Sequence, residues 1–353
     1  MGGVTYKLSE VGAAGASSPP KRERQSMYRA VVADELGPVG HYTLRHLPRP
    51  QLEAGEVRVA LVAVGISYVD VLTAEGNYQV KPPVPFIPGS EAAGVVIETA
   101  PDVPDVSVGD RVVCGGWYGL LADECVLPRD AVTPIPPGID LVEAAVFPAS
   151  FSTAWHALVD RAHVRPGETV LVLGAGGATG YAAVQVAKVL GAHVIASAST
   201  HEKRALATGG GADATIDARA ADWRDAVKAA NGGMPVDVVF DPIGGAATDA
   251  AFRSLAWCGR HLIVGFPGGI ASLRTNLPLL KGASLVGVNI RQFYLSQPDK
   301  AAANMAHLLD LASAGRLRPA VARNYPIEDY ALVMAEAAKG ESAGRIVVNL
   351  NMR

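Results

Sequence analysis

Four glycines lie close together in the middle of the chain, directly after the short apolar segment 169–173. They are Gly174, Gly176, Gly177 and Gly180. A strand followed by a glycine turn and a helix lets backbone N–H groups approach a pyrophosphate, and the helix N-terminus adds a positive dipole end. The pattern predicts a dinucleotide site, although the glycines do not follow the usual GxGxxG spacing and such turns also serve packing alone.

The nature of the dinucleotide depends on the residues that follow the next expected strand, 193–198. In dinucleotide folds an acid at this place binds the ribose 2′-hydroxyl. Here the strand is followed by hydroxyl and basic residues, which are Ser199, Thr200, Lys203 and Arg204. Hydroxyl groups and cations suit a 2′-phosphate, so the sequence favours NADPH over NADH. The two hydroxyl residues also fit the cap of the next helix, and both roles are compatible.

Composition and charge limit the classes of function. The chain has 353 residues, enough for about two domains. Hydrophobic residues make up 49%, and the net charge of −3 disfavours a general nucleic-acid or acidic-membrane partner. No apolar run reaches the ~18 residues of a membrane helix. The few, widely spaced cysteines form no CxxC pair and fit a reducing, cytoplasmic setting.

The chain changes character along its length. Residues 1–26 are rich in Gly, Ala, Ser and Pro and predict a disordered leader. Short β-type runs with many Gly and Pro residues follow, and strand and helix patterns alternate later. We therefore predict an α/β protein with a β-rich domain, formed by 27–151 and 294–353, and a doubly wound Rossmann domain over 152–293. Within the latter we expect a helix over 246–258.

Three further segments accompany the glycine turn and are more specific together than the turn alone. They are PGSEAAGV at 88–95, GDRV at 109–112 and TAWHAL at 153–158, with Gln185 in the helix after the turn. From about Met27 to its C-terminus the chain resembles the zinc-free branch of the medium-chain dehydrogenase/reductase family, the quinone oxidoreductase (zeta-crystallin-like) group. It departs from the group at Ala178 and Thr179, where Gly and Val are common. The resemblance implies a GroES-like catalytic domain and a Rossmann NADPH-binding domain.

The resemblance also implies that the catalytic zinc of the alcohol dehydrogenase relatives is missing. Ser67 stands where those relatives have a ligating Cys, and Ser90 where they have a ligating His. The third ligand position, near Ala149, lacks a thiol. Hydroxyl groups without thiolate or imidazole do not make a tetrahedral zinc site. Isolated histidines such as His156 and His163 are more typical of structural positions, so we expect no metal.

The lack of a metal favours a substrate that is already electrophilic, because no Lewis acid would stabilise an alkoxide. A quinone or an α,β-unsaturated carbonyl accepts hydride directly from NADPH and spreads the charge onto oxygen. The chain is therefore expected to be a zinc-independent, NADPH-dependent reductase of such small molecules. Two alternatives stay open: a 2-enoyl thioester reductase, and a nucleotide-binding protein with little turnover.

The resemblance points to three candidate catalytic residues. Tyr78 matches the catalytic tyrosine of the related 2-enoyl thioester reductases, where a phenol can donate a proton. The same tyrosine fits a wall of the pocket, since the quinone reductases resemble this segment too. Ser67 and Tyr68 belong to the segment that faces the nicotinamide in the zinc relatives, and they either line the pocket or orient the substrate.

Further cofactor contacts are expected beyond the C-terminal ends of later strands. Phe266, Asn289 and the segment 241–244 are candidates, and each fits a simple turn equally well. By resemblance, Thr153 touches the nicotinamide ring. Arg345 takes the place of a basic residue that commonly precedes the last strand of the family, and it either reaches the cofactor phosphate or lies on the surface.

Two expectations concern the surroundings of the site. Asp70 and Glu91 are expected to be buried carboxylates paired with cations such as Arg111. The β-branched segment 284–290 is expected to form a strand at the sheet edge, and bare edges invite pairing. The family pairs this strand across a two-fold axis, so the resemblance implies a homodimer.

Overall fold

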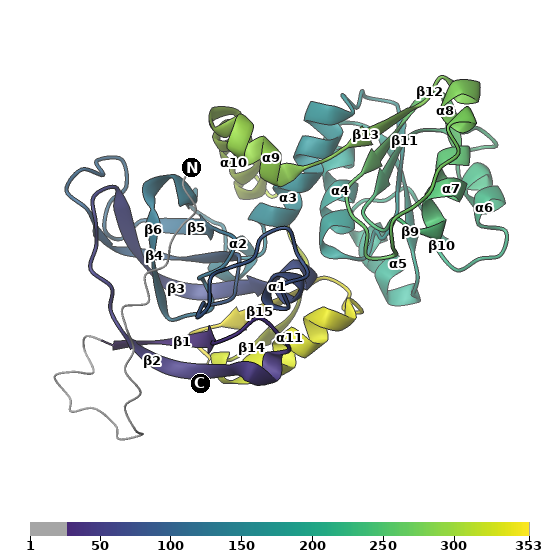
Figure 1. Ribbon diagram of the computed structural model, residues 1–353. Coiled ribbons are helices and arrows are strands. Elements are labelled where there is room, and N and C mark those ends of the chain that lie inside the picture. The colour runs from purple at the N-terminus through teal and green to yellow at the C-terminus, as the bar shows by residue number, and fades with distance from the viewer. Residues whose placement is uncertain (1–26, 353) are drawn as a thin grey trace. The chain divides into compact units, whose positions relative to one another are not determined.

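The computed structural model describes residues 27–352, which divide into two compact units (Figure 1). Among the described residues, the first unit combines those up to Pro148 with those from Val321 to Met352, and the second is Ala149–Ala320. One unit is rich in strands and the other alternates strands with helices. The predicted α/β class is confirmed. The leader predicted over 1–26 lies outside the described residues.

A seven-stranded sheet forms the frame of the first unit, in the order β14-β15-β3-β4-β5-β7 with β6 paired to β3. Its strands are β3 (Glu56–Ile66), β4 (Glu91–Thr99), β5 (Arg111–Gly115), β6 (Glu124–Pro128), β7 (Val132–Pro134), β14 (Val321–Tyr325) and β15 (Arg345–Asn349). A separate antiparallel pair consists of β1 (Met27–Ala33) and β2 (Tyr42–Pro48). The helices are α1 (Tyr68–Ala74), α2 (Leu141–Ala144) and α11 (Tyr330–Lys339).

The core of the first unit follows β3, which has neighbours on both sides and β-branched residues along its length. Val57, Val59 and Val64 are fully buried, as expected for a strand that packs on both faces. Gly94 in β4 lets the two backbones approach, because a Cβ there would lie 2.2 Å from the Ala60 carbonyl oxygen. The end of β3 pairs with the start of β4 at Gly65 and Glu91, so α1 and the turn before β4 lie at the same end of this strand pair.

The second unit is built on a six-stranded parallel sheet in the order β10-β9-β8-β11-β12-β13, which is the doubly wound arrangement. The strands are β8 (Thr169–Val172), β9 (His193–Ala198), β10 (Ala214–Asp217), β11 (Val236–Asp241), β12 (Leu255–Ile263) and β13 (Ser284–Gly287). The helices are α3 (Pro148–Trp155), α4 (Ala178–Val189), α5 (His201–Gly209), α6 (Trp223–Ala230), α7 (Ala246–Arg253), α8 (Asn276–Lys281), α9 (Ile290–Ser296) and α10 (Pro298–Ser313), with a π-helix, η4, at His156–Arg161.

Residues 294–320 belong to the second unit, whereas the sequence-based division had placed them with the first. Side-chain contacts explain this position. Phe293 stacks on His156 with ring centroids 4.0 Å apart. Asp160 accepts a hydrogen bond from Asn304 at 3.0 Å and pairs with Lys300 at 2.8 Å. These contacts hold α9 and α10 against η4 within one unit.

The strands and helices that carry the site match the sequence prediction closely, with two differences. The helix predicted over 246–258 ends at Arg253, and β12 begins at Leu255. The segment 284–290 is a strand only as far as Gly287, and it forms the edge of the sheet as predicted. Within residues 27–352 no helix is long and apolar enough to cross a membrane.

Candidate functional site

The glycine turn between β8 and α4 brings a strand and a helix into close contact. Gly174 has a φ of +58°, which favours glycine. A Cβ at Gly174 would also lie 2.7 Å from Cδ1 of Ile243. Gly180 lies in the first turn of α4, where a Cβ would come within 2.2 Å of the Gly174 carbonyl oxygen. The packing of the turn therefore needs glycine at both positions.

The two glycines between them differ in their surroundings. A Cβ at Gly176 would lie 2.3 Å from the Cβ of Lys203, so α5 closes this position. A Cβ at Gly177 would meet only the Gly174 carbonyl oxygen, at 3.4 Å. Packing among the described residues therefore does not require glycine at 177. A ligand that approaches the backbone would require it, as a pyrophosphate does in dinucleotide folds.

The N-terminus of α4 offers uncapped backbone N–H groups. Gly177 is the N-cap residue, and no side chain of the described residues caps this end. The helix is 12 residues long, so its first N–H groups and its dipole both present positive charge. The arrangement fits an anion such as a phosphate group.

The end of β9 leads directly into the N-terminus of α5. Thr200 caps this helix, since its Oγ1 accepts a hydrogen bond from the Lys203 N–H at 3.2 Å. The capping role foreseen for this residue is thus present. Arg204 donates to the Ala198 carbonyl oxygen at 3.0 Å and pairs with Asp217 at 3.0 Å. Of the two cations named from the sequence, Lys203 is therefore the one next to the glycine turn.

The other predicted cofactor contacts of the second unit lie in loops or near helix ends. Phe266 follows β12 and is 53% exposed. Asn289 caps α9, with its Oδ1 accepting the Gln292 N–H at 3.0 Å. Thr153 in α3 donates its hydroxyl proton to the Ala149 carbonyl oxygen at 2.7 Å. Their contacts with a cofactor stay predictions.

The candidate catalytic residues of the first unit gather around α1. Ser67 is the N-cap residue of this helix, and its backbone N–H and hydroxyl both donate to Oδ2 of Asp70 at 2.7 Å. Asp70 is buried, while Tyr68 is 40% exposed. Tyr78 is half-buried in the loop after α1. The Ser67 hydroxyl is thus fixed in direction by a buried carboxylate.

Asp70 and Glu91 are both buried as expected, but the predicted pairing with Arg111 is wrong. Glu91 forms a buried ion pair with Arg345, and Arg111 donates instead to the Ile139 carbonyl oxygen. Arg345 is only 6% exposed, so the alternative that it lies on the surface is also wrong. Its guanidinium is held by Glu91, which does not support the other alternative, a phosphate contact.

Two known families match separate parts of the chain. Zinc-binding dehydrogenase matches residues 178–309, and the alcohol dehydrogenase GroES-like domain matches residues 53–137. Quinone oxidoreductase-like protein 2 of Mus musculus is 36% identical over 326 residues, which cover 92% of each chain. The chain belongs to the medium-chain dehydrogenase/reductase family. It is thus an oxidoreductase of small molecules by family, with a GroES-like and a Rossmann-like part.

Solved structures of the medium-chain dehydrogenase/reductase family agree in fold. A probable oxidoreductase from Mycobacterium abscessus is 34% identical, with a TM-score of 0.84, covering 92% of this chain and 99% of that one. The quinone oxidoreductase from Thermus thermophilus, whose structure was solved also in complex with NADPH, is 32% identical. Its TM-score is 0.79, and the match covers 91% of this chain and all of the other.

The zinc implied by the name of one matching family does not fit this medium-chain dehydrogenase/reductase. The Ser67 hydroxyl is bonded to Asp70, and Ser90 offers a second hydroxyl where an imidazole would be needed. In the described part of the chain, no three His, Cys, Asp or Glu side chains lie close enough together to hold a metal ion. His156 is buried and bonded to Asp160 at 3.0 Å, which is a structural position.

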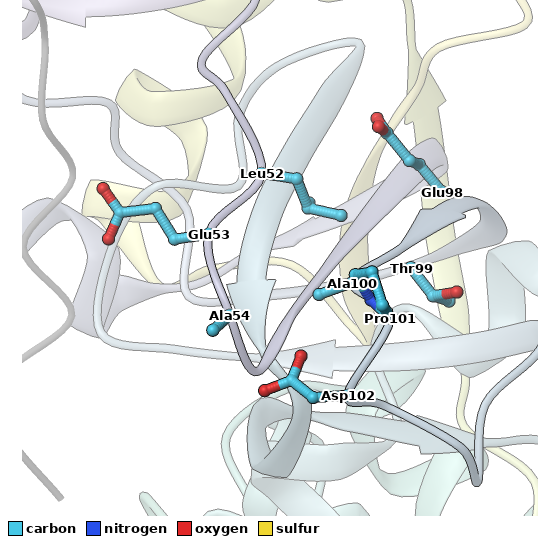
Figure 2. A pocket seen from close by; sticks show the side chains of 8 residues that line it. All are labelled: Leu52, Glu53, Ala54, Glu98, Thr99, Ala100, Pro101 and Asp102. Carbon is cyan, nitrogen blue, oxygen red and sulfur yellow. The ribbon is translucent and has the colours of Figure 1, made fainter.

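A surface pocket of this medium-chain dehydrogenase/reductase lies elsewhere in its first unit (Figure 2). Its lining residues are Leu52, Glu53, Ala54, Glu98, Thr99, Ala100, Pro101 and Asp102. Glu98 pairs with Arg58 at 2.7 Å, and Asp102 accepts the Gly55 N–H at 2.9 Å. The acids around the pocket therefore stabilise the local fold, and none of the predicted site residues lines it.

One buried pair beside the glycine turn was not recognised from the sequence. Asp241, at the end of β11, lies 3.0 Å from Nε2 of His261 in β12. The segment 241–244 was a candidate because it follows a strand, which is a usable signal. His261 gave no signal, because a single histidine in an apolar strand does not show which residue of the next strand it contacts.

Proposed function

We propose that this oxidoreductase binds NADPH at the glycine turn and transfers hydride, without zinc, to a quinone or an α,β-unsaturated carbonyl. The observation that carries the proposal is the N-terminus of α4 at Gly177, which no side chain of the described residues caps and where packing does not require glycine. The end of β9 carries no acid and is followed by Ser199, Thr200 and Lys203, which favours a 2′-phosphate. The NADPH complex of the Thermus relative supports the same choice.

The roles of the residues follow from this proposal. Bound NADPH supplies a hydride to the electrophilic carbon or quinone ring, and a proton from solvent or a side chain completes the reduction. Gly177 leaves room for the pyrophosphate, and Gly174, Gly176 and Gly180 allow the close packing of the turn that presents it. Ser199, Thr200 and Lys203 hold the 2′-phosphate. Thr153, Phe266 and Asn289 contact the nicotinamide half. The protein then contributes mainly orientation of the reacting atoms and exclusion of water.

On the substrate side, Ser67 and Tyr68 orient or enclose the acceptor in this proposal. The Ser67 hydroxyl donates to Asp70, so its oxygen lone pairs are what it offers to a substrate donor. Tyr78 is the candidate proton donor, because a phenol is protonated at neutral pH. If the proton comes from water instead, Tyr78 is a wall of the pocket.

The experiment that tests the function is NADPH oxidation, followed by absorbance, with three acceptors: a quinone, a simple enone and a crotonyl thioester. Turnover of the quinone or the enone is the expected result. Preference for the thioester would favour the 2-enoyl thioester reductase, and Tyr78→Phe should then lower kcat strongly. NADPH binding without oxidation would favour a binding protein with little turnover, and neither binding nor oxidation would overturn the proposal.

We further propose a homodimer formed through β13. This strand is the last in the sheet and pairs with β12 alone among the described residues. Large apolar side chains are exposed around it, including Trp257 at 74%, Leu279 at 79% and Leu285 at 42%. A second copy that pairs its own β13 across a two-fold axis would cover both the edge and these side chains. Sedimentation should show a dimer, and Leu285→Lys should yield a monomer.

A reducing, cytoplasmic setting completes the proposal. Cys114, Cys125 and Cys258 are all free thiols, and a chain kept in a reducing compartment retains its thiols. Fractionation of the source cells would test this part independently of the activity.

A further inference from the structure

A buried polar cluster lies beneath the loops that follow β11 and β12. His261 is 0% exposed and Asp241 is 2% exposed. The His261 ring stacks against Phe252 with centroids 6.0 Å apart. An apolar side chain would satisfy this packing equally well. Packing alone therefore does not explain why this residue is a histidine. Its Nδ1 is also buried without a hydrogen-bond partner among the described residues, which is an unusual position for a polar atom.

Asp241 is the centre of the cluster and accepts four hydrogen bonds. Its Oδ2 accepts from the Thr248 hydroxyl at 2.8 Å and from His261 Nε2–H at 3.0 Å. Its Oδ1 accepts from the backbone N–H groups of Ile243 at 2.9 Å and Gly244 at 2.8 Å. Burial alone would raise the pKa of Asp241, but these hydrogen bonds hold it below the ordinary value, so the group is a carboxylate.

The turn held by Asp241 has two direct contacts with the loops around it. Cδ1 of Ile243 occupies the space that a side chain at Gly174 would need. The Gly245 N–H donates to the Gly269 carbonyl oxygen at 2.7 Å, and the Gly268 N–H donates to the Ile243 carbonyl oxygen at 2.8 Å. The turn is therefore joined to the glycine turn on one side and to the Phe266 loop on the other.

We propose that His261 is a positioning residue for the dinucleotide, acting through Asp241 on the turn 243–245. Its Nε2–H orients the carboxylate so that Oδ1 can bind both backbone N–H groups of the turn. The turn 243–245 then fixes the side chain of Ile243 against Gly174 and, through its backbone hydrogen bonds, the loop that carries Phe266. His261 touches no ligand itself. This inference rests on the proposed function, because it assumes that the glycine turn binds NADPH.

Two variants of His261 separate the hydrogen bond from the packing. His261→Gln keeps an N–H that can reach Asp241, whereas His261→Leu fills similar space without a donor. Both lose the ring stack on Phe252. We expect His261→Leu to raise the Kd and KM for NADPH about tenfold, with kcat little changed, as the loss of a bond to a charged group would do. We expect His261→Gln to retain most of the affinity.

A control variant measures what loss of stability alone does. Val227→Ala removes buried methyl groups from the hydrophobic cluster that also contains Phe252. It should lower the melting temperature without changing the Kd for NADPH. If Val227→Ala and His261→Leu weaken binding equally, or if His261→Gln is as weak as His261→Leu, the positioning role is wrong.

A measurement without cofactor gives a second test. In His261→Leu, the amide protons of Ile243 and Gly244 should exchange with solvent faster than in the wild type, and in Val227→Ala they should not. Equal exchange in wild type and His261→Leu would overturn the inference. If the wild-type protein binds NADPH and His261→Leu binds it equally well, only this inference fails. If the wild type binds no dinucleotide, the proposed function fails as well.

Discussion

The glycine turn of the second unit and the region around Ser67 in the first unit are stabilised in different ways. The turn depends on backbone: Gly174 and Gly180 are needed because side chains would collide there. The region around Ser67 depends on side chains, which bind one another through Ser67–Asp70 and Glu91–Arg345. A site built from backbone can admit a ligand because it lacks side chains. The polar side chains around Ser67, in contrast, already form hydrogen bonds and ion pairs with one another.

This difference shows how the first unit keeps charged groups in its interior. Glu91 and Arg345 neutralise each other inside the unit, and Asp70 orients Ser67. A buried pair of this kind is costly to break but adds little over an apolar pair. The comparison therefore predicts large losses of stability in the first unit and large losses of cofactor affinity in the second.

The largest expected effect comes from breaking the buried ion pair. Glu91→Gln leaves Arg345 charged in the interior and should reduce the free energy of unfolding by about 3–5 kcal/mol. Asp34→Asn, which breaks the exposed pair with Arg45, should cost less than about 1 kcal/mol. Chemical denaturation measures both. A similar small loss in both variants would contradict a structural role for the pair.

The same pair also decides between the two ideas about Arg345. Arg345→Met, if folded, should bind NADPH with unchanged Kd, because its guanidinium is held by Glu91. A tenfold loss of affinity in the folded variant would instead support a phosphate contact. Arg345 in the first unit would then contribute to cofactor binding, and the two regions would no longer differ in this respect.

The next effect concerns the glycine turn. Gly180→Ala places a Cβ 2.2 Å from a backbone oxygen, which should destabilise the second unit by about 3 kcal/mol and abolish NADPH binding. Gly209→Ala is the control, because no atom lies within 4 Å of its Cβ position at the end of α5. It should leave stability unchanged or raise it slightly. Calorimetry and NADPH titration test both, and tight binding by Gly180→Ala would refute the backbone argument.

The backbone features were the more predictable part of the molecule. The strand, turn and helix around Gly174 follow from local patterns, and the edge position of β13 followed from order along the chain. Side-chain partners were less predictable: Glu91 and Arg345 are 254 residues apart in sequence. The place of α10 in the second unit was missed for the same reason, since it depends on contacts such as that between Asp160 and Lys300.

A smaller effect distinguishes NADPH from NADH. Lys203→Met keeps the aliphatic stem that packs on Gly176 and removes the charge. We expect the affinity for NADPH to fall about tenfold, and that for NADH to stay unchanged, because only NADPH carries the 2′-phosphate. Lys228→Met, on the exposed face of α6, is the matched control. Equal losses for both cofactors would remove Lys203 from the specificity site.

Ser67 tests whether the first unit retains any chemistry of its own. Because Ser67 is the N-cap residue of α1, Ser67→Ala should reduce the free energy of unfolding by about 1 kcal/mol. Asp140→Ala, which removes the cap of α2 in the same unit, should cost a similar amount. If Ser67 also orients the substrate, its variant alone should raise KM for the acceptor. Equal kinetics in both variants would leave Ser67 as a cap only.

The smallest effect uses pH to compare a buried and an exposed carboxylate. Burial tends to raise the pKa of Asp160, but hydrogen bonds from Lys300, His156 and Asn304 hold it below its ordinary value. Because the folded state binds the proton less well, the carboxylate stabilises the second unit above about pH 4, and this contribution disappears as the pH falls through the lowered pKa. Asp160→Asn should therefore cost about 1 kcal/mol at neutral pH and almost nothing in acid.

The exposed counterpart is Asp105 in the first unit, whose pKa is likewise lowered by a hydrogen bond from Arg129. Solvent screens this surface pair, so Asp105→Asn should leave the unfolding free energy unchanged at every pH. Urea unfolding of both variants between neutral pH and pH ~3 gives the comparison. If the stability difference between wild type and Asp160→Asn were constant with pH, the lost stability would come from packing of the Asn side chain. Charge would then be stabilising at neither carboxylate, and the contrast between buried and exposed pairs would disappear.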